Sequence, residues 1–137
     1  MWREVLGIET KLVDEENRVF LNSRKDSARW DVARLGWMAD YNDAGNFLDI
    51  FRSGAANNDA GYSDPRFDSL LDAAEASADA QHRRELLEQA ERLMLADYPV
   101  IPIYFYSSKR LIKAYVKGAR PNPLNRVYSK DLYIEPN

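Results

Sequence analysis

The strongest constraint on the fold is the run of residues 78–97, where apolar side chains recur at the spacing of an α-helix. The expected buried face of this helix consists of Leu86, Leu87, Ala90, Leu93 and Met94. Ser77 or Asp79 is suited to cap its start. Tyr98-Pro99 ends it, because the residue before a proline is disfavoured in the helical conformation. A long helix with one apolar face is therefore predicted.

A second amphipathic helix is predicted immediately before this one. Asp64 is a good N-cap and Pro65 suits the first helical position. The apolar stripe that follows is formed by Phe67, Leu70, Leu71 and Ala74. Shorter helices are predicted over 15–25 and 43–51, and residues 1–7 have the pattern of the last turns of a helix that Gly7 ends.

Four segments have the β-branched and aromatic composition of strands: 8–13, 30–37, 100–106 and 110–116. Pro102 restricts the third of these to a sheet edge or a bulge, because proline cannot donate a ladder hydrogen bond. The order of strands and helices predicts a mixed α/β (α+β) fold, with sheet segments flanked by about four helices.

The composition excludes several classes of function. The net charge of −3 comes from 22 acidic and 19 basic residues that are interspersed, so there is no basic patch for nucleic acid. The chain has no Cys and a single His, His82, which leaves few metal ligands, and no cofactor motif is present. No apolar run approaches the roughly 18 residues of a membrane-spanning helix, and the first residues lack the pattern of a signal peptide.

The most informative segment for function is 31–42, with the sequence DVARLGWMADYN. Asp40 is suited to bind an ammonium group and Arg34 a carboxylate, while Trp37 and Tyr41 offer flat amphipathic walls. Gly36 allows another backbone to approach closely. These features together suit an extended zwitterionic ligand, and a peptide is such a ligand.

Several ordered blocks of residues resemble the C-terminal part of the periplasmic oligopeptide-binding proteins, the extracytoplasmic receptors of peptide ABC importers. These blocks are Trp2-x-x-x-Leu6-Gly7, Phe20-Leu21, the segment 31–42, Phe47-Leu48, Tyr62, Pro65-x-Phe67-Asp68, Pro99-x-x-Pro102-x-Tyr104-x-Tyr106, Arg110-Leu111 and Tyr133-Ile134. The resemblance implies a fragment of a two-lobed, family 5 solute-binding fold. It places 1–99 in the ligand-binding C-terminal lobe, and 100–137 in hinge strands and a tail that return to the other lobe.

The resemblance assigns charged groups to the two ends of a bound peptide. Asp40 matches the aspartate that binds the α-ammonium, and Arg34 matches a basic residue that meets the C-terminal carboxylate of shorter peptides. Arg24 matches a second such residue, although its spacing from Arg34 is one residue longer than in the family. Structural alternatives remain: a turn-capping role for Asp40, a salt bridge for Arg34 and a solvated helix end for Arg24.

The same resemblance assigns main-chain and aromatic contacts. Leu35, Gly36 and Trp37 would bind the peptide backbone as an added β-strand, and Trp37 would line a side-chain pocket. Tyr106 would contact the peptide from the hinge side. For both aromatic residues the alternative is a place in the protein interior or on a half-buried strand.

The sequence thus favours a peptide-capturing receptor over an enzyme. Its implied partners are small peptides with a free N-terminus and, in the full-length periplasmic protein, a membrane permease. One alternative is an interaction module whose exposed strand edges pair with another chain, and the fragment itself is expected to self-associate in this way. The other is a hydrolase based on Asp40 and Asp43, although no nucleophile motif accompanies them.

Overall fold

The computed structural model describes residues 1–122 and 124–135. The chain forms two units, 1–34 and 35–137, which are described separately below. Among the described residues, no helix is both long enough and apolar enough to cross a membrane.

The first unit consists of short helices joined by irregular chain. Helix α1, Trp2–Leu6, ends at Gly7, whose positive φ of 69° is a conformation that favours glycine. Helix α2, Asn17–Ser23, starts at Glu16, whose carboxylate accepts hydrogen bonds from the first turn. The 3₁₀ helix η1, Ser27–Arg29, follows. The helices predicted at the start of the chain and over 15–25 are thus confirmed.

The second unit contains the predicted helical core. Helix α3, Gly45–Leu48, continues into the 3₁₀ helix η2, Asp49–Phe51, and together they confirm the helix predicted over 43–51. Helix α4 is Pro65–Ala76, with Asp64 accepting a hydrogen bond from Arg66 N at 2.8 Å. Helix α5 is Ala80–Ala96, and its cap is Asp79. Hydrogen bonds from His82 N and Gln81 N lower the pKa of Asp79.

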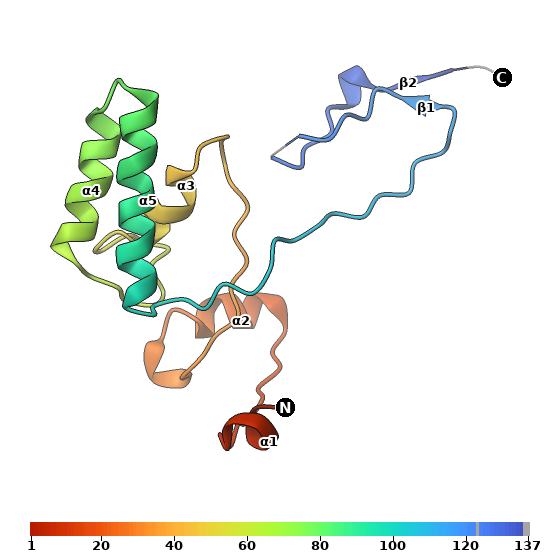
Figure 1. Cartoon of the computed structure of the whole chain (residues 1–137). Helices are drawn as coiled ribbons and strands as arrows, with labels where there is room; N and C mark the ends of the chain where they lie inside the picture. Colours follow the sequence, from red (N-terminus) through yellow and green to blue (C-terminus); the bar gives the residue numbers. More distant parts are fainter. Residues whose placement is uncertain (123, 136–137) are drawn as a thin grey trace. The chain divides into compact units, whose positions relative to one another are not determined.

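Helices α4 and α5 lie side by side, and α3 packs against α5 (Figure 1). Their facing sides supply one continuous hydrophobic core, in which Phe67 and Ala90 are completely buried. The other buried members are Leu48, Ile50, Phe51, Leu71, Ala74, Leu86, Leu87 and Met94. The periodicity of both long helices therefore predicted which of their faces would be buried, although Leu70 and Leu93 of these faces are only partly buried.

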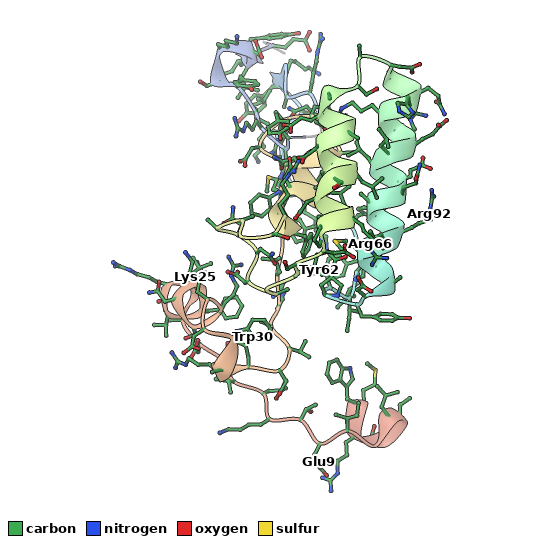
Figure 2. All side chains as sticks on the ribbon, turned by 90° about the vertical axis from the view of Figure 1, so that its left-hand side faces the viewer. Glu9, Lys25, Trp30, Tyr62, Arg66 and Arg92 are labelled. Carbon is green, nitrogen blue, oxygen red and sulfur yellow. The ribbon has the colours of Figure 1, made fainter. Side chains whose placement is uncertain are left out.

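Tyr62 links the loop before α4 to the end of α5. Its ring meets Phe67 edge-on, with centroids 5.4 Å apart, and its hydroxyl donates to Asp97 Oδ2 at 3.0 Å. Figure 2 shows Tyr62 near Arg66, at the same end of the helix pair. Burial, together with the hydrogen bond to Asp97, raises the pKa of Tyr62 to about 12. Tyr62 is thus a neutral structural residue at physiological pH.

The chain after α5 is mostly irregular. Strand β1, Val116–Lys117, pairs antiparallel with β2, Tyr133–Ile134, so that Val116 lies opposite Ile134 and Lys117 opposite Tyr133. The 3₁₀ helix η3, Ser129–Asp131, precedes β2. Gly118 follows β1 with a φ of 86°, and a side chain there would collide with the carbonyl of Asp131. Among the described residues, this two-stranded sheet is the only sheet.

The four predicted strands are largely wrong. Segments 8–13, 30–37 and 100–106 have no strand, and of 110–116 only Val116 belongs to one. A strand needs a neighbour that accepts and donates its backbone hydrogen bonds, whereas a helix satisfies these groups within itself. The described chain supplies a paired neighbour only for β1 and β2.

Candidate functional site

The candidate site is the segment 35–46, which leads into α3 (Figure 1). Most of it has no regular secondary structure, so its backbone groups depend on side chains for their partners. Two residues that sequence reasoning did not select, Asn46 and Arg83, hold it at separate points.

Asn46 is the first of these two attachment points. It lies in α3 and is only 6% exposed. Its Oδ1 atom accepts one hydrogen bond from Trp37 Nε1 at 2.9 Å and another from the backbone N–H of Asp40 at 3.1 Å. Trp37 is half-buried and packs against the hydrophobic core. The Asn46 amide therefore fixes both the indole ring and the main chain at Asp40.

Asp43 provides the second attachment. Its Oδ1 atom accepts hydrogen bonds from Gly45 N at 2.7 Å and from Arg83 Nη2 of α5 at 2.9 Å. The hydrogen bond from Arg83, with a smaller contribution from Gly45 N–H, holds the pKa of Asp43 below its usual range despite partial burial. A side chain at Gly45 would crowd both partners, since its Cβ would lie 2.9 Å from Asp43 Oδ1.

The contacts of Asp43 limit its use in the hydrolase alternative, which pairs the carboxylates of Asp40 and Asp43. A general acid needs a raised pKa, whereas that of Asp43 is lowered and its carboxylate is occupied by Arg83 and Gly45. Asp43 thus has a structural role in the described chain. In the alternative of a hydrolase based on Asp40 and Asp43, Asp43 is therefore not suited to be the general acid.

Asp40 belongs to the first attachment point through its backbone, and its side chain is exposed. Its backbone N–H is bound to Asn46, while no hydrogen bond or ion pair occupies its carboxylate within the part of the chain that the structure describes. Tyr41 beside it is 51% exposed, with its hydroxyl 3.5 Å from Asp49 Oδ2. A fixed backbone that presents an unoccupied carboxylate is suited to bind a cation such as an ammonium group.

The backbone at Leu35 and Gly36 is accessible to solvent and to a ligand. Both residues are exposed, and a Cβ at Gly36 would meet no atom within 4 Å. The described chain by itself therefore does not require glycine at this position. The predicted close approach of a ligand backbone stays a prediction, and the open space is compatible with it.

The remaining predicted site residues lie elsewhere. Tyr106 is 78% exposed in the irregular segment 101–112. Arg34 is exposed in the first unit. Arg24 follows α2 there, and its carbonyl accepts a hydrogen bond from Trp30 Nε1 at 3.0 Å. The structure thus brings together Trp37, Asp40 and Asn46 within one unit.

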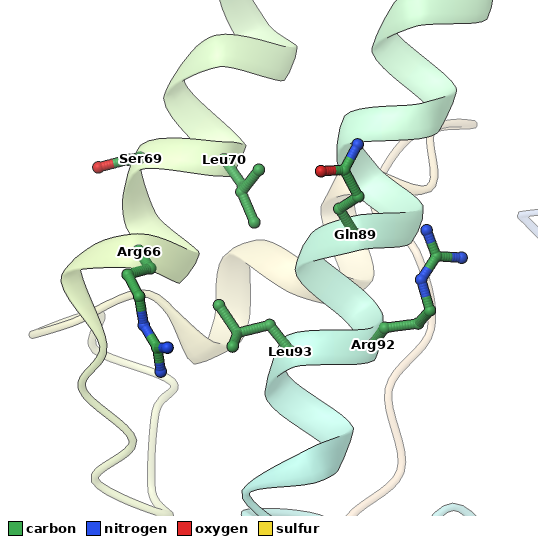
Figure 3. Close-up of a pocket in the computed structure, with 6 residues that line it drawn as sticks. All are labelled: Arg66, Ser69, Leu70, Gln89, Arg92 and Leu93. Carbon is green, nitrogen blue, oxygen red and sulfur yellow. The ribbon is translucent and has the colours of Figure 1, made fainter.

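A separate open groove lies between α4 and α5, with Leu70 and Leu93 facing each other across it (Figure 3). Arg66 and Arg92 border it, but each guanidinium has an acidic partner, Asp64 at 2.6 Å and Glu88 at 3.6 Å. None of the predicted site residues lines this groove. Among the described residues, no cluster of His, Cys, Asp and Glu could hold a metal ion.

Comparison with known proteins connects this geometry to a family. The chain is 38% identical over 135 residues to the periplasmic oligopeptide-binding protein OppA of Salmonella typhimurium, covering 98% of this chain and 25% of that protein. The structure of Burkholderia pseudomallei OppA matches with a TM-score of 0.85 and 39% identity, over 98% of this chain and 27% of that one.

A second solved structure, Haemophilus influenzae OppA in complex with RPPGFSPFR, matches with a TM-score of 0.80 and 39% identity. It covers 90% of this chain and 24% of the other. No model of a known protein family matches the sequence.

The chain belongs to the family 5 extracellular solute-binding proteins, which include these periplasmic oligopeptide-binding proteins. It spans about a quarter of the length of the curated relatives it matches. The predicted fold class is confirmed, because the mixed helices and short strands correspond to part of the periplasmic binding protein fold of its structural neighbours.

Proposed function

We propose that this chain forms part of a periplasmic receptor that captures oligopeptides for an ABC importer. The observation that carries the proposal is the identity of 38% over nearly the whole chain to a periplasmic oligopeptide-binding protein. The structural match to a relative in complex with the peptide RPPGFSPFR supports a peptide as the ligand.

In this proposal Asp40 binds the α-ammonium group of the peptide. Its carboxylate is exposed and unoccupied within the described chain, while its backbone is fixed by Asn46. A charge-assisted hydrogen bond to an ammonium is stronger than one between neutral groups. The free amine of the peptide is thus the feature that this part of the site recognises.

The other contacts follow the extended form of a peptide. Leu35, Gly36 and Trp37 bind its main chain by β-strand addition, which gives affinity that is independent of the ligand's side chains. Arg34 and Arg24 bind the terminal carboxylate of shorter peptides. Tyr106 closes the site from the segment that crosses to the second lobe.

The proposed domain division follows from the same view. Residues 1–99 contribute the ligand-binding lobe, and 100–137 form the hinge strands and the returning tail. The exposed apolar side chains of 101–112 support this division, because strands that cross between lobes would be covered there by the rest of the receptor. In the isolated chain, the same surface favours self-association.

Binding without chemical turnover is the proposed mode of action. An interaction module remains the second candidate, favoured by the exposed apolar side chains of 101–112. Calorimetry separates the two, since a receptor binds small free peptides and an interaction module does not.

The test is a chimera in which these residues replace the matching 135 residues of the Salmonella protein. We expect it to bind a free oligopeptide, and Asp40→Asn to weaken that binding by about 30-fold or more, since truncating one partner of a buried charge pair costs about 2–5 kcal/mol. An N-acetylated copy of the peptide is expected to bind weakly to both proteins.

Asp14→Asn is the matched control, because Asp14 is an exposed carboxylate of the first unit. It should leave the affinity unchanged. Equal affinity of the unmodified and Asp40→Asn chimeras for the free peptide would refute the role of Asp40, and cleavage of the peptide would refute the receptor.

A further inference from the structure

We infer that Asn46 is a positioning residue for the ligand's ammonium group, acting through the main chain of Asp40. The inference rests on the proposed function and extends it to a residue that never has to touch the ligand.

The geometry at Asn46 is a convergence of two donors on one atom. Trp37 Nε1 and Asp40 N, nine and six residues earlier in the chain, both donate to Asn46 Oδ1. A carbonyl oxygen has two acceptor positions, and both are used here. The indole ring and the Asp40 backbone are therefore held relative to each other by one side chain.

The atom that makes these bonds is itself firmly placed. Asn46 is 6% exposed, and the neighbouring Gly45 and Leu48 of α3 are also buried. Three residues before Asn46, Asp43 is tied to Arg83 of α5 at 2.9 Å. The backbone of Asp40 is thus held by an anchor on α3, three residues before an anchor on α5, in a segment without regular secondary structure.

The consequence for binding follows from the exposure of the Asp40 side chain. Because no protein group holds the carboxylate within the described chain, the positions that it can reach are set by its own backbone. Loss of the Asn46 oxygen would leave two N–H donors without their partner and release that backbone. Ligands with a free amine should then lose affinity, while ligands that lack the charge should not.

Two variants isolate the acceptor oxygen. Asn46→Leu has a similar volume and no acceptor, whereas Asn46→Asp keeps an oxygen at the same position. In the 137-residue chain, the NMR signal of the Trp37 indole proton, assigned with Trp37→Phe, reports the bond directly. We expect Asn46→Leu to shift it and to speed its solvent exchange by about tenfold or more, and Asn46→Asp to preserve it.

Affinity is measured in the chimera, with a free oligopeptide and its N-acetylated copy. Asn46→Leu should lower the affinity for the free peptide by about tenfold and the affinity for the acetylated peptide by less than about twofold. Asn46→Asp should bind both peptides with an affinity within about threefold of that of the unmodified protein. The double variant with Asp40→Asn should bind no more weakly than Asp40→Asn alone, since coupled residues are not additive.

Equal losses for both peptides, or additive losses in the double variant, would overturn the inference and leave Asn46 a structural residue. An indole signal that Asn46→Leu does not change, in a chimera that binds peptides, would also overturn it. A chimera that binds no peptide would overturn the proposed function and the ligand role of Asn46 together, whereas the indole proton would still show whether the anchor exists.

Discussion

Two apolar regions of the second unit behave in opposite ways. In the helical core, Phe67 is completely buried between α4 and α5, whereas Phe105 in the segment 101–112 is 99% exposed. Both regions are rich in aromatic and aliphatic side chains. Hydrophobicity is therefore not what separates them.

The difference lies in where each region finds its hydrogen-bond partners. The helices satisfy their backbone groups internally and then bury their apolar faces against one another. An extended segment such as 101–112 must pair with another strand before its side chains can pack, and the described chain provides none for it. The comparison predicts that equivalent substitutions will have very different effects in the two regions.

The largest expected effect comes from the two phenylalanines. Phe67→Ala should lower the free energy of unfolding by about 3–5 kcal/mol, since it removes buried surface and leaves a cavity. Phe105→Ala should change it by less than about 0.5 kcal/mol when the isolated chain is dilute enough to be monomeric. Urea denaturation followed by far-ultraviolet circular dichroism measures both. Comparable losses in the monomeric chain would mean that 101–112 packs against the rest of the chain in solution.

A smaller effect is expected from two asparagines that bridge loops. Asn58 Nδ2 donates to the carbonyls of Arg52 at 3.0 Å and Tyr62 at 2.7 Å, and its Oδ1 accepts from Tyr62 N at 3.1 Å. Asn58→Ala should therefore cost about 1–2 kcal/mol, because it leaves partly buried groups without partners.

The matched control is Asn122→Ala, in the region after the core. Asn122 makes a similar pair of bonds with the backbone of Arg126, but in an exposed loop. Water replaces those partners, so the cost should stay below about 0.5 kcal/mol. Thermal unfolding of the two variants measures how much each asparagine contributes to stability. A larger loss for Asn122→Ala than for Asn58→Ala would contradict the comparison.

The smallest effect depends on pH. The folded pKa of Asp43 lies below its unfolded value, so its ion pair with Arg83 stabilises the fold above the ordinary pKa of 3.8 and is lost as pH falls through the folded pKa. Arg83→Gln should cost about 1 kcal/mol at neutral pH and progressively less below about pH 4.

Arg92→Gln provides the control for that measurement. Arg92 pairs with Glu88 at 3.6 Å on the exposed face of α5, and such surface pairs contribute only about 0.3–0.5 kcal/mol. Melting temperatures of both variants across the pH range give the comparison. A constant difference between Arg83→Gln and the unmodified chain down to pH 3 would contradict the role of Asp43.

The fold was predictable wherever the decisive contacts are local. The caps Asp64 and Asp79, the stop after α1 at Gly7 and the buried faces of α4 and α5 all follow from residues within a few positions of one another. The strands were not predictable, because composition cannot reveal whether a partner strand lies beside a β-prone segment. Residues 100–106 show this most clearly.

The candidate site was partly predictable for the same reason. The charges and aromatic rings of 31–42 pointed to Asp40 and Trp37, whose chemistry is visible in the sequence. Asn46 and Arg83 carried no comparable signal. An asparagine near the start of a predicted helix is ordinary, and Arg83 is one of several charges on an amphipathic helix.

The sequence by itself determined the main helices, the caps and buried faces of α4 and α5, and the presence of a carboxylate three residues after a tryptophan in a turn-forming segment. Only the tertiary structure decided that Asn46 accepts from both Trp37 and Asp40, and that Asp43 is held by Arg83 across forty residues of chain. Helical hydrogen bonds join near neighbours, so periodicity records them. Contacts between side chains of different elements depend on how those elements pack, which is settled only when the core forms.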